Sequence, residues 1–476
     1  MTMTSRTHSL GLALLVTLAG CTTVGPDYKG APPVAADALG QSRFARDDGA
    51  SSSATPAPAQ WWRSLNDATL DALVDDALRD SPTLHAAEAR LRVARASLIQ
   101  QEANRRPSGS ASALGAGVWQ GPTTDQSNSL QLYSVGFDAT WEADLFGGGR
   151  RAVEAASAQA QAVQADLADA QVSLAAEVAA AYVELRAQQA RRALLQRTAA
   201  GDAQVLALLR QRRAQGTARA DEVEQRVQQA EATQGALSDL AADIASSLDR
   251  LALLVGQAPG ALDAQLAAAA SASASLPAVP ANVAVGDPAA LLQRRPDIRA
   301  AERRLAGRTA DIGQQTAKYF PKLSLLGNIG LAATDPGQLL RASNLALIAV
   351  PYLSWNVLDF GRTAASVRQA EANRDEAVAN YQATVLSALQ DANTALARFG
   401  QQRQAVQHLL AQQASAGRTV ELTQQRRAAG AASQIDLLDA QHQDADARAR
   451  TVDGQAQLLK NFVSLQKSLG LGWTAG

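Results

Sequence analysis

The chain has 476 residues and a formal net charge of -1, and 4% of its residues are aromatic. A nearly neutral chain without basic runs has no field that would attract nucleic acid, so we exclude nucleic-acid binding. The low aromatic content argues against a large globular core. Beyond the N-terminal region there is no apolar stretch of about 20 residues, the length that a membrane-spanning helix needs. If the mature chain spans a membrane, it must therefore use strands.

The N-terminus has the pattern of a secretory signal peptide. A positively charged start precedes an apolar run from Leu10 to Leu18 that is too short to span a bilayer and ends in small residues. The string Leu-Ala-Gly-Cys at 18–21 resembles the lipobox of bacterial lipoproteins, in which the cysteine is acylated and becomes the first mature residue. Cys21 is the only cysteine in the chain. The alternative to acylation is that Cys21 is a buried side chain in an ordinary signal or core helix. Thr22, rather than Asp, points by the bacterial sorting rule to the outer membrane.

The second half of the chain repeats the first at an offset of 214 residues, as from Pro82 to Pro296. Matching strings include Ala-Ala-Glu at 86–88 and 300–302, Phe-Gly at 146–147 and 360–361, and Arg-Arg-Ala-x-Gly at 212–216 and 426–430. So many matches at one offset indicate a duplicated architecture. A stretch rich in Ala, Ser and Pro separates the copies and is predicted to be a loose connector.

The expected organisation follows from this duplication. Each copy has a helix, a strand hairpin, a long helix and a return helix, in that order. We expect a signal peptide at 1–20, a lipid-anchored N-terminal segment at 21–65, repeat 1 at 66–258, the connector at 259–290, repeat 2 at 291–472 and a C-terminal tail at 473–476.

Alternating residues predict the strands. Residues 130–141 and 323–331 alternate between apolar and small or polar side chains, which is typical of a strand with one buried face. Residues 108–118 and 345–355 are weaker candidates, and the second contains Pro351, which a paired strand tolerates only at an edge or a bulge. Each copy therefore offers one hairpin.

Long helices follow the hairpins. The proline-free stretch from Arg150 to Arg213 is dense in strong helix formers and would be roughly 95 Å long at about 1.5 Å per residue. Breaks at Gly216 and Gly430 would turn the chain back into return helices with leucines at three- and four-residue spacing. Narrow apolar stripes on alanine-rich helices favour side-by-side packing over a great length.

Open strand edges cannot lie in lipid, because each unpaired backbone group costs several kcal/mol, roughly. Four strands cannot close a barrel, and the smallest barrels need about eight, so several chains must contribute. The alternative is a small soluble sheet on a periplasmic coiled coil.

Four strings carry a family resemblance. They are Cys-Thr-Thr-Val-Gly-Pro-Asp-Tyr at 21–28, Trp61-Trp62, Arg-Arg-Pro-Asp-Ile at 294–298 and Tyr-Phe-Pro-x-Leu-Ser-Leu at 319–325. With them the mature chain resembles the outer-membrane factor family of TolC-like efflux channels, and more narrowly its NodT-type lipoprotein branch. The resemblance implies a mainly α fold with transmembrane β-strands: a homotrimer whose four strands per chain form a 12-stranded barrel, continued by a long periplasmic helical tunnel.

No residues suggest catalysis, so we expect no enzymatic activity and no cofactor besides the covalent lipid on Cys21. His85, His408 and His442 lack metal-ligand spacing and are predicted to be solvated helix-surface residues. No phosphate-binding loop follows a strand, and Ser, His and Asp are too scattered for a triad.

The resemblance also implies a gate. In TolC-like channels, acidic residues on the inner helices ring the closed periplasmic aperture, and the matching positions are Asp436 and Asp439, with Glu222 as the counterpart in the first copy. The i, i+3 spacing places the first two on one helix face, and three copies would make a carboxylate ring that binds cations and disfavours anions. The alternative is that all three are acids at helix starts, favoured by the helix dipole.

The turns between long and return helices resemble the tips that meet a periplasmic adaptor. Their candidate docking residues are Arg213, Gly216, Thr217, Arg427, Gly430 and Ala431. Arginine and small residues are equally normal for capping and solubility at a turn.

The resemblance implies an exit duct of a tripartite efflux system, with a periplasmic adaptor and an inner-membrane pump of the resistance-nodulation-division type as partners and outer-membrane lipid around it. Alternatives are a periplasmic lipoprotein adaptor or scaffold with long helical hairpins, a type I secretion or metal-export duct of the same fold, and a lipid-anchored enzyme. The duplication argues against the adaptor, and the missing catalytic set argues against the enzyme. Substrate choice is expected to be made by the pump.

Overall fold

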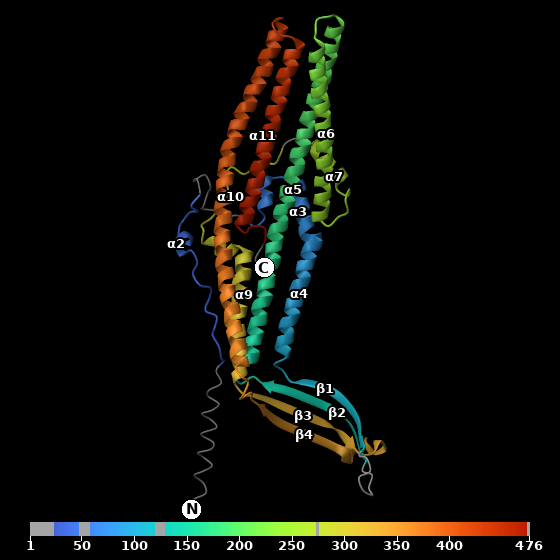
Figure 1. The fold of residues 1–476 in the computed structure, drawn as a ribbon, viewed down its shortest axis with the longest axis vertical. Coiled ribbons are helices and arrows are strands. Elements are labelled where there is room, and N and C mark those ends of the chain that lie inside the picture. The colour runs from blue at the N-terminus through green and yellow to red at the C-terminus, as the bar shows by residue number, and fades with distance from the viewer. Residues whose placement is uncertain (1–22, 47–57, 120–128, 273–275, 474–476) are drawn as a thin grey trace, which may run out of the picture. The chain divides into compact units, whose positions relative to one another are not determined.

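The computed structural model describes residues 23–46, 58–119, 129–272 and 276–473 (Figure 1). The predicted signal peptide at 1–20 and the predicted lipidation site Cys21 lie outside these residues. Among the described residues, no helix combines the length and the apolar character that crossing a membrane requires.

The chain forms two compact units, and each of them draws on both copies of the repeat. The strand unit comprises Met1–Pro32, Arg90–Gln164 and Ala300–Ala383, and the hairpin unit comprises Pro33–Ala89, Ala165–Arg299 and Thr384–Gly476. Four helices run from one unit into the other: α4 (Pro82–Ala103), α5 (Gly148–Ala214), α9 (Pro296–Thr316) and α10 (Arg362–Ala428).

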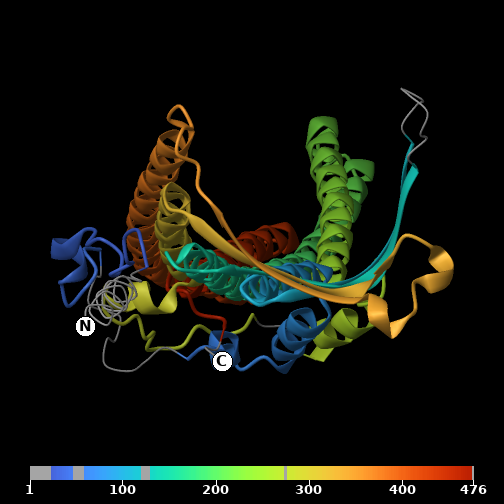
Figure 2. The same cartoon turned by 90° about the horizontal axis from the view of Figure 1, so that it is seen from below.

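The strand unit contains one antiparallel sheet in the order β1-β2-β3-β4 (Figure 2). Its strands are β1 (Ser108–Trp119), β2 (Ser129–Ala143), β3 (Lys322–Ala333) and β4 (Leu345–Ser354), so all four predicted strands are confirmed. The central pair, β2 and β3, joins the two copies, with Tyr133 opposite Ala333 and Ala143 opposite Leu323.

Proline and glycine positions explain details of this sheet. Pro351 lies in β4, the last strand in the order, opposite Leu325 of β3, and an edge strand tolerates a residue without an N–H donor. Gly136 and Gly330 face each other where β2 and β3 pair, and a Cβ on Gly136 would lie 2.8 Å from the Gly330 Cα atom. The sheet also exposes large apolar side chains, among them Phe137, Leu347 and Leu353, as a surface that meets lipid or another chain would.

The hairpin unit contains the two helical hairpins that the sequence predicts. In the first copy α5 is followed by α6 (Ala220–Leu254), and in the second copy α10 is followed by α11 (Gln434–Ser468). The long helices have 67 residues each and the return helices have 35 each, so corresponding helices have the same length in both copies. On α6 the predicted apolar stripe is buried at Leu240, Ile244 and Leu251.

Short helices complete the chain. They are α2 (Ala36–Leu39), α3 (Ala68–Asp80), α7 (Asp263–Ala272), α8 (Ala290–Arg294) and the single-turn 3-10 helices at Trp61–Leu65, Ala317–Tyr319, Pro336–Gln338 and Ala342–Asn344. Asp67 caps α3 by accepting hydrogen bonds from the backbone N–H groups of Thr69 and Leu70, and it also accepts one from the Tyr182 hydroxyl at 2.9 Å.

Two expectations about packing were wrong. The hairpin unit has a continuous core in which Trp61, Trp62 and Phe462 are buried with their rings packed edge to face, although aromatic residues are few in the chain. The connector is not loose throughout either, because it contains α7 and buries apolar side chains at Leu262, Leu266, Val283 and Val285. Isolated apolar residues within an Ala-rich segment are enough to fix it to a core.

Candidate functional site

The two turns at the ends of the hairpins have the same geometry. Gly216 has a φ of +73° and Gly430 a φ of +75°, a conformation that glycine adopts without strain. Two backbone hydrogen bonds close each turn: Thr217 N donates to Arg212 O and Gly216 N to Arg213 O, with the same pattern at Ala431 and Gly430. This is a Schellman motif, so the predicted breaks between long and return helices are confirmed.

The candidate gate residues Glu222 and Asp436 cap the return helices. Asp436 accepts a hydrogen bond from the Ser433 backbone N–H at 2.7 Å, while Ser433 Oγ accepts one from the Asp436 N–H at 3.1 Å. Glu222 lies at the same point of α6 and accepts from the Arg219 N–H at 3.4 Å. The hydrogen bonds from Ser433 lower the pKa of the Asp436 carboxyl, and Arg426 and Arg212 add to this, so that the group carries a negative charge beside the turn.

The third gate candidate, Asp439, forms an ion pair between the two return helices. Its Oδ1 lies 3.0 Å from a guanidinium nitrogen of Arg226 on α6, and both side chains are partly exposed. The carboxylate of α11 therefore has a partner in the first copy of the repeat. In this protomer the pair is a link between α6 and α11, and it has to break before Asp439 can face a lumen as an unpaired charge.

The prediction of a solvated surface histidine holds for His85 and His408 but was wrong for His442. The His442 side chain is mostly buried, its Nδ1 lies 3.6 Å from Asp202 Oδ1 of α5, and its Nε2 has no hydrogen-bond partner. Asp202 is buried and accepts a hydrogen bond from the Thr233 hydroxyl of α6 at 2.7 Å. The ring packs against Gly201, where a Cβ would lie 2.6 Å from Nε2, so glycine makes room for it.

A charged cluster surrounds the string at 294–298. Arg295 donates to the Ser468 carbonyl at 3.0 Å, and its guanidinium lies 2.7 Å from Asp297 and 3.4 Å from Asp391. Asp169 borders the same cavity of about 340 Å³, and burial, with help from Asp297, raises the pKa of its carboxyl. The family string therefore ties the start of α9 to the end of α11.

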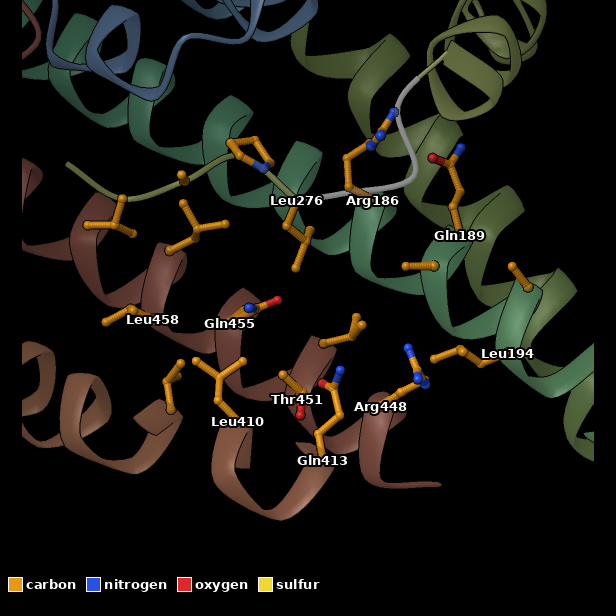
Figure 3. Close-up of a pocket in the computed structure, with 18 of the residues that line it drawn as sticks. Arg186, Gln189, Leu194, Leu276, Leu410, Gln413, Arg448, Thr451, Gln455 and Leu458 are labelled. Carbon is orange, nitrogen blue, oxygen red and sulfur yellow. The ribbon is translucent and has the colours of Figure 1, made fainter. Parts of the chain in front are cut away.

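A cavity of about 740 Å³ lies in the described part of the hairpin unit. Side chains of α5, α10 and α11 line it, with Leu276 of the connector on a further side (Figure 3). Among the described residues its lining is mainly aliphatic, with the guanidinium groups of Arg186, Arg197 and Arg448, and includes no acid, histidine or serine.

Among the described residues, no cluster of three or more His, Cys, Asp or Glu side chains could hold a metal ion.

Sequence reasoning missed the partners of these side chains, but the duplication carried a signal for them. At the offset of 214 residues, Arg226 corresponds to Ala440, Asp202 to Ala416 and His442 to Gln228. Each contact between copies thus uses a residue that the other copy lacks. Departures from a repeat mark contacts that only one copy makes.

The comparisons with known proteins agree with this architecture. A family model described as outer membrane efflux protein matches residues 73–257 and 288–471, one segment in each copy of the repeat. Outer membrane protein OprJ of Pseudomonas aeruginosa is 31% identical over 469 residues, which cover 98% of this chain and 96% of that protein. The toluene efflux pump outer membrane protein TtgI of Pseudomonas putida is 30% identical over 480 residues, covering 98% of each chain.

A solved structure of the outer-membrane channel OprN superimposes on this chain with a TM-score of 0.81 and 32% sequence identity. The match covers 95% of this chain and 100% of that chain. The two chains therefore share their fold.

Proposed function

This chain belongs to the outer membrane efflux protein family and is an efflux channel of the outer membrane, and on that premise we propose that it forms a trimeric exit duct. In this proposal the duct receives small molecules from an inner-membrane pump through a periplasmic adaptor and releases them outside. The observation that carries the proposal is the combination of one four-stranded sheet with two long helical hairpins in a chain of this family.

The open edges of the sheet support the trimer. Within the described residues the sheet ends at β1 and β4, and their outer edges have no strand partner in this chain. Unpaired backbone groups cost several kcal/mol, roughly, in hydrocarbon, so strands of further copies must cover both edges in a membrane. Three copies with four strands each make a closed 12-stranded barrel, and their helices make the periplasmic tunnel.

The partners and cargo follow from the relatives. TtgI is named as the outer membrane protein of a toluene efflux pump, and we infer an equivalent pump component here, with a pump of the resistance-nodulation-division type and an adaptor that meets the tips. The tips offer Arg213, Thr217 and Arg427 at exposed positions beside the two glycines. The duct itself performs no chemistry and binds no cofactor, and acylation of Cys21 anchors it to the membrane.

The gate proposal rests on the tip geometry. Asp436 is charged and held by its capping bonds, and Asp439 is paired with Arg226 of the other hairpin. We propose that docking of the adaptor separates the tip helices, breaks the Arg226–Asp439 pair and opens the aperture. The carboxylates would then line the opening and favour cations over anions.

Planar-bilayer conductance of the purified, lipidated protein tests the duct, alongside its mass in detergent. We expect discrete channel openings from a species of three protomers. A monomer that never conducts would overturn the duct and favour a periplasmic scaffold.

The gate is tested in the same bilayers by Asp439→Asn, which weakens the pair with Arg226 while keeping the size of the side chain. We expect a higher single-channel conductance than that of the unmodified protein. Asp221→Asn is the matched control, because Asp221 is an exposed acid of the same tip that pairs with Arg219 and not with Arg226, and it should change conductance less. Equal conductance of Asp439→Asn and the unmodified protein would remove Asp439 from the gate.

A further inference from the structure

The segment that follows the predicted lipidation site is bound to the strand unit by a built site. Val24 N donates to the Phe146 carbonyl at 3.1 Å, which attaches the segment just after the end of β2. The Arg151 side chain, only 4% exposed, lies at the start of α5 and donates to the carbonyl oxygens of Val24 and Gly25, each at 3.2 Å. It also lies 2.6 Å from a carboxylate oxygen of Asp27. One buried guanidinium therefore holds the segment at three residues, Val24, Gly25 and Asp27.

Glycines allow the segment to lie directly on the backbone beneath it. A Cβ on Gly25 would lie 2.3 Å from the Gly313 Cα atom of α9, and a Cβ on Gly147 would lie 2.6 Å from the Thr23 side chain. At its far end the Tyr28 hydroxyl donates to Glu302 at 3.2 Å, and the guanidinium of Arg303 lies 5.5 Å from the centre of the Tyr28 ring. These contacts define the anchor groove as Gly147, Arg151, Glu302, Arg303 and Gly313.

The anchor groove draws on both copies of the repeat, and three of its five residues differ at the corresponding positions, whereas Gly147 and Glu302 match Gly361 and Glu88. At the offset of 214 residues, Arg151 corresponds to Ala365 and Gly313 to Ile99, while Arg303 corresponds to Ala89. The second copy therefore lacks the guanidinium, and the first copy carries a bulky side chain where the groove needs glycine.

We propose that the anchor groove positions the lipid carried by Cys21 beside the junction of β2 and α5. Cys21 is three positions before Val24, and an extended chain spans at most about 3.6 Å per residue, so the lipid is attached within about 11 Å of the Val24 backbone. The acyl chains therefore enter the leaflet next to the sheet that spans the membrane, and the N-terminus is a fixed anchor and not a long tether. Arg151 acts as a positioning residue for that anchor. The inference rests on the proposed acylation of Cys21.

Limited trypsin digestion of the full-length, lipidated trimer in detergent micelles tests the groove. Lys29 is exposed, but a protease needs the residues on both sides of it in an extended form, which the bound Tyr28 prevents. The measured quantity is the rate of cleavage after Lys29 divided by the rate after Arg213, an exposed tip residue outside the groove that corrects for differences in protease activity. We expect this ratio to rise at least tenfold in Arg151→Ala and in Gly313→Leu, and about threefold in Asp27→Asn.

Arg150→Ala is the matched control, because Arg150 lies beside Arg151 in sequence but pairs with Asp144, outside the groove. Its cleavage ratio should stay within about twofold of the unmodified protein. An unchanged ratio in Arg151→Ala, or an equal rise in Arg150→Ala, would overturn the docking proposal.

The mass of the released N-terminal peptide shows whether Cys21 is acylated, independently of whether the segment is docked in the anchor groove. A peptide that begins at an acylated Cys21 supports the lipid anchor, whereas an unmodified peptide with the expected ratios would leave a docked segment without a lipid and overturn the anchor role. Conductance of the same preparation reports the duct independently, so failure of the channel and failure of the groove give different results.

Discussion

The two junctions between strand and long helix share a glycine turn but differ in the backbone before it, where Phe360 has a φ of +54° and Phe146 has no positive φ, and in their surroundings. Each contains the string Phe-Gly, with Gly147 at a φ of +80° and Gly361 at +85°. At the first junction the Phe146 ring stacks on Phe320, with 4.5 Å between ring centroids and 17° between planes. At the second junction the Phe360 side chain is 90% exposed.

This difference shows how a duplicated fold acquires distinct surfaces. The first junction is closed by residues of its own chain, among them the N-terminal segment that Arg151 holds. The second junction has Ala365 in place of this arginine and exposes Val357, Leu358 and Phe360 together. An apolar patch of this kind is what contact with lipid or with a neighbouring protomer requires. The first junction is therefore covered by residues of its own chain, whereas the second is exposed and can contact lipid or a neighbouring protomer.

The strongest test of the comparison is the pair Phe146→Ala and Phe360→Ala. Phe146 is half-buried and stacked, so its removal should lower the free energy of unfolding by about 2–3 kcal/mol, and that of Phe360 by less than about 0.5 kcal/mol. Denaturant unfolding of the detergent-solubilised protein, followed by circular dichroism, measures both. Equal losses would show that the two junctions are packed alike, and a Phe360→Ala protein that unfolds normally but runs as a monomer would assign that residue to the trimer.

A smaller and equal effect is expected from the helix caps. Asp144 accepts hydrogen bonds from the Gly149 and Arg150 N–H groups, and Asp359 accepts from those of Gly361 and Thr363. Asp144→Ala and Asp359→Ala should each cost about 1 kcal/mol in the same unfolding measurement, because each leaves helix N–H groups without an acceptor. A loss at only one of them would mean that the capping function is not shared by the two copies.

The comparison extends to the tips, where one ion pair joins the two copies. Arg226→Ala removes the partner of Asp439, and because both side chains are partly exposed the expected loss of stability is only about 0.5 kcal/mol. The sharper readout is amide hydrogen exchange, which should quicken at the starts of α6 and α11 and stay unchanged in the sheet. Uniformly faster exchange would show that the pair supports the whole hairpin unit.

The smallest effect expected is a pH dependence at the second junction. The hydroxyl and N–H of Thr363 and the N–H of Gly361 donate to Asp359 and lower the pKa of its carboxyl. An aspartate in the unfolded chain has a pKa near 4, and the pKa of Asp359 in the folded protein is lower. The ionised carboxylate therefore stabilises the fold fully above about pH 4, and this stabilisation is lost as the pH falls through the folded pKa. Asp359→Asn should therefore make the unfolding midpoint less sensitive to pH between 5 and 3, and equal slopes in both proteins would contradict this.

The sequence predicted the elements well because their signals are local. Alternation marked β2 and β3, glycine marked the turns at Gly216 and Gly430, and helix formers marked α5 and α10. The partners of single side chains were not predictable in this way, since Asp439 and Arg226 are far apart in the chain and meet only when two return helices pack. The connector misled for a related reason, because its Ala-rich composition hides the few residues, such as Leu266, that fix it to the core.

The pairing of β2 with β3 has a consequence for how the protein is made. Asp138 lies opposite Asn328, so the centre of the sheet joins residues that leave the ribosome far apart in time. Contacts of such high sequence separation form slowly, and until the second copy arrives the first hairpin exposes an unpaired edge. The N-terminal half alone is therefore expected to be prone to aggregation until the second copy pairs with it.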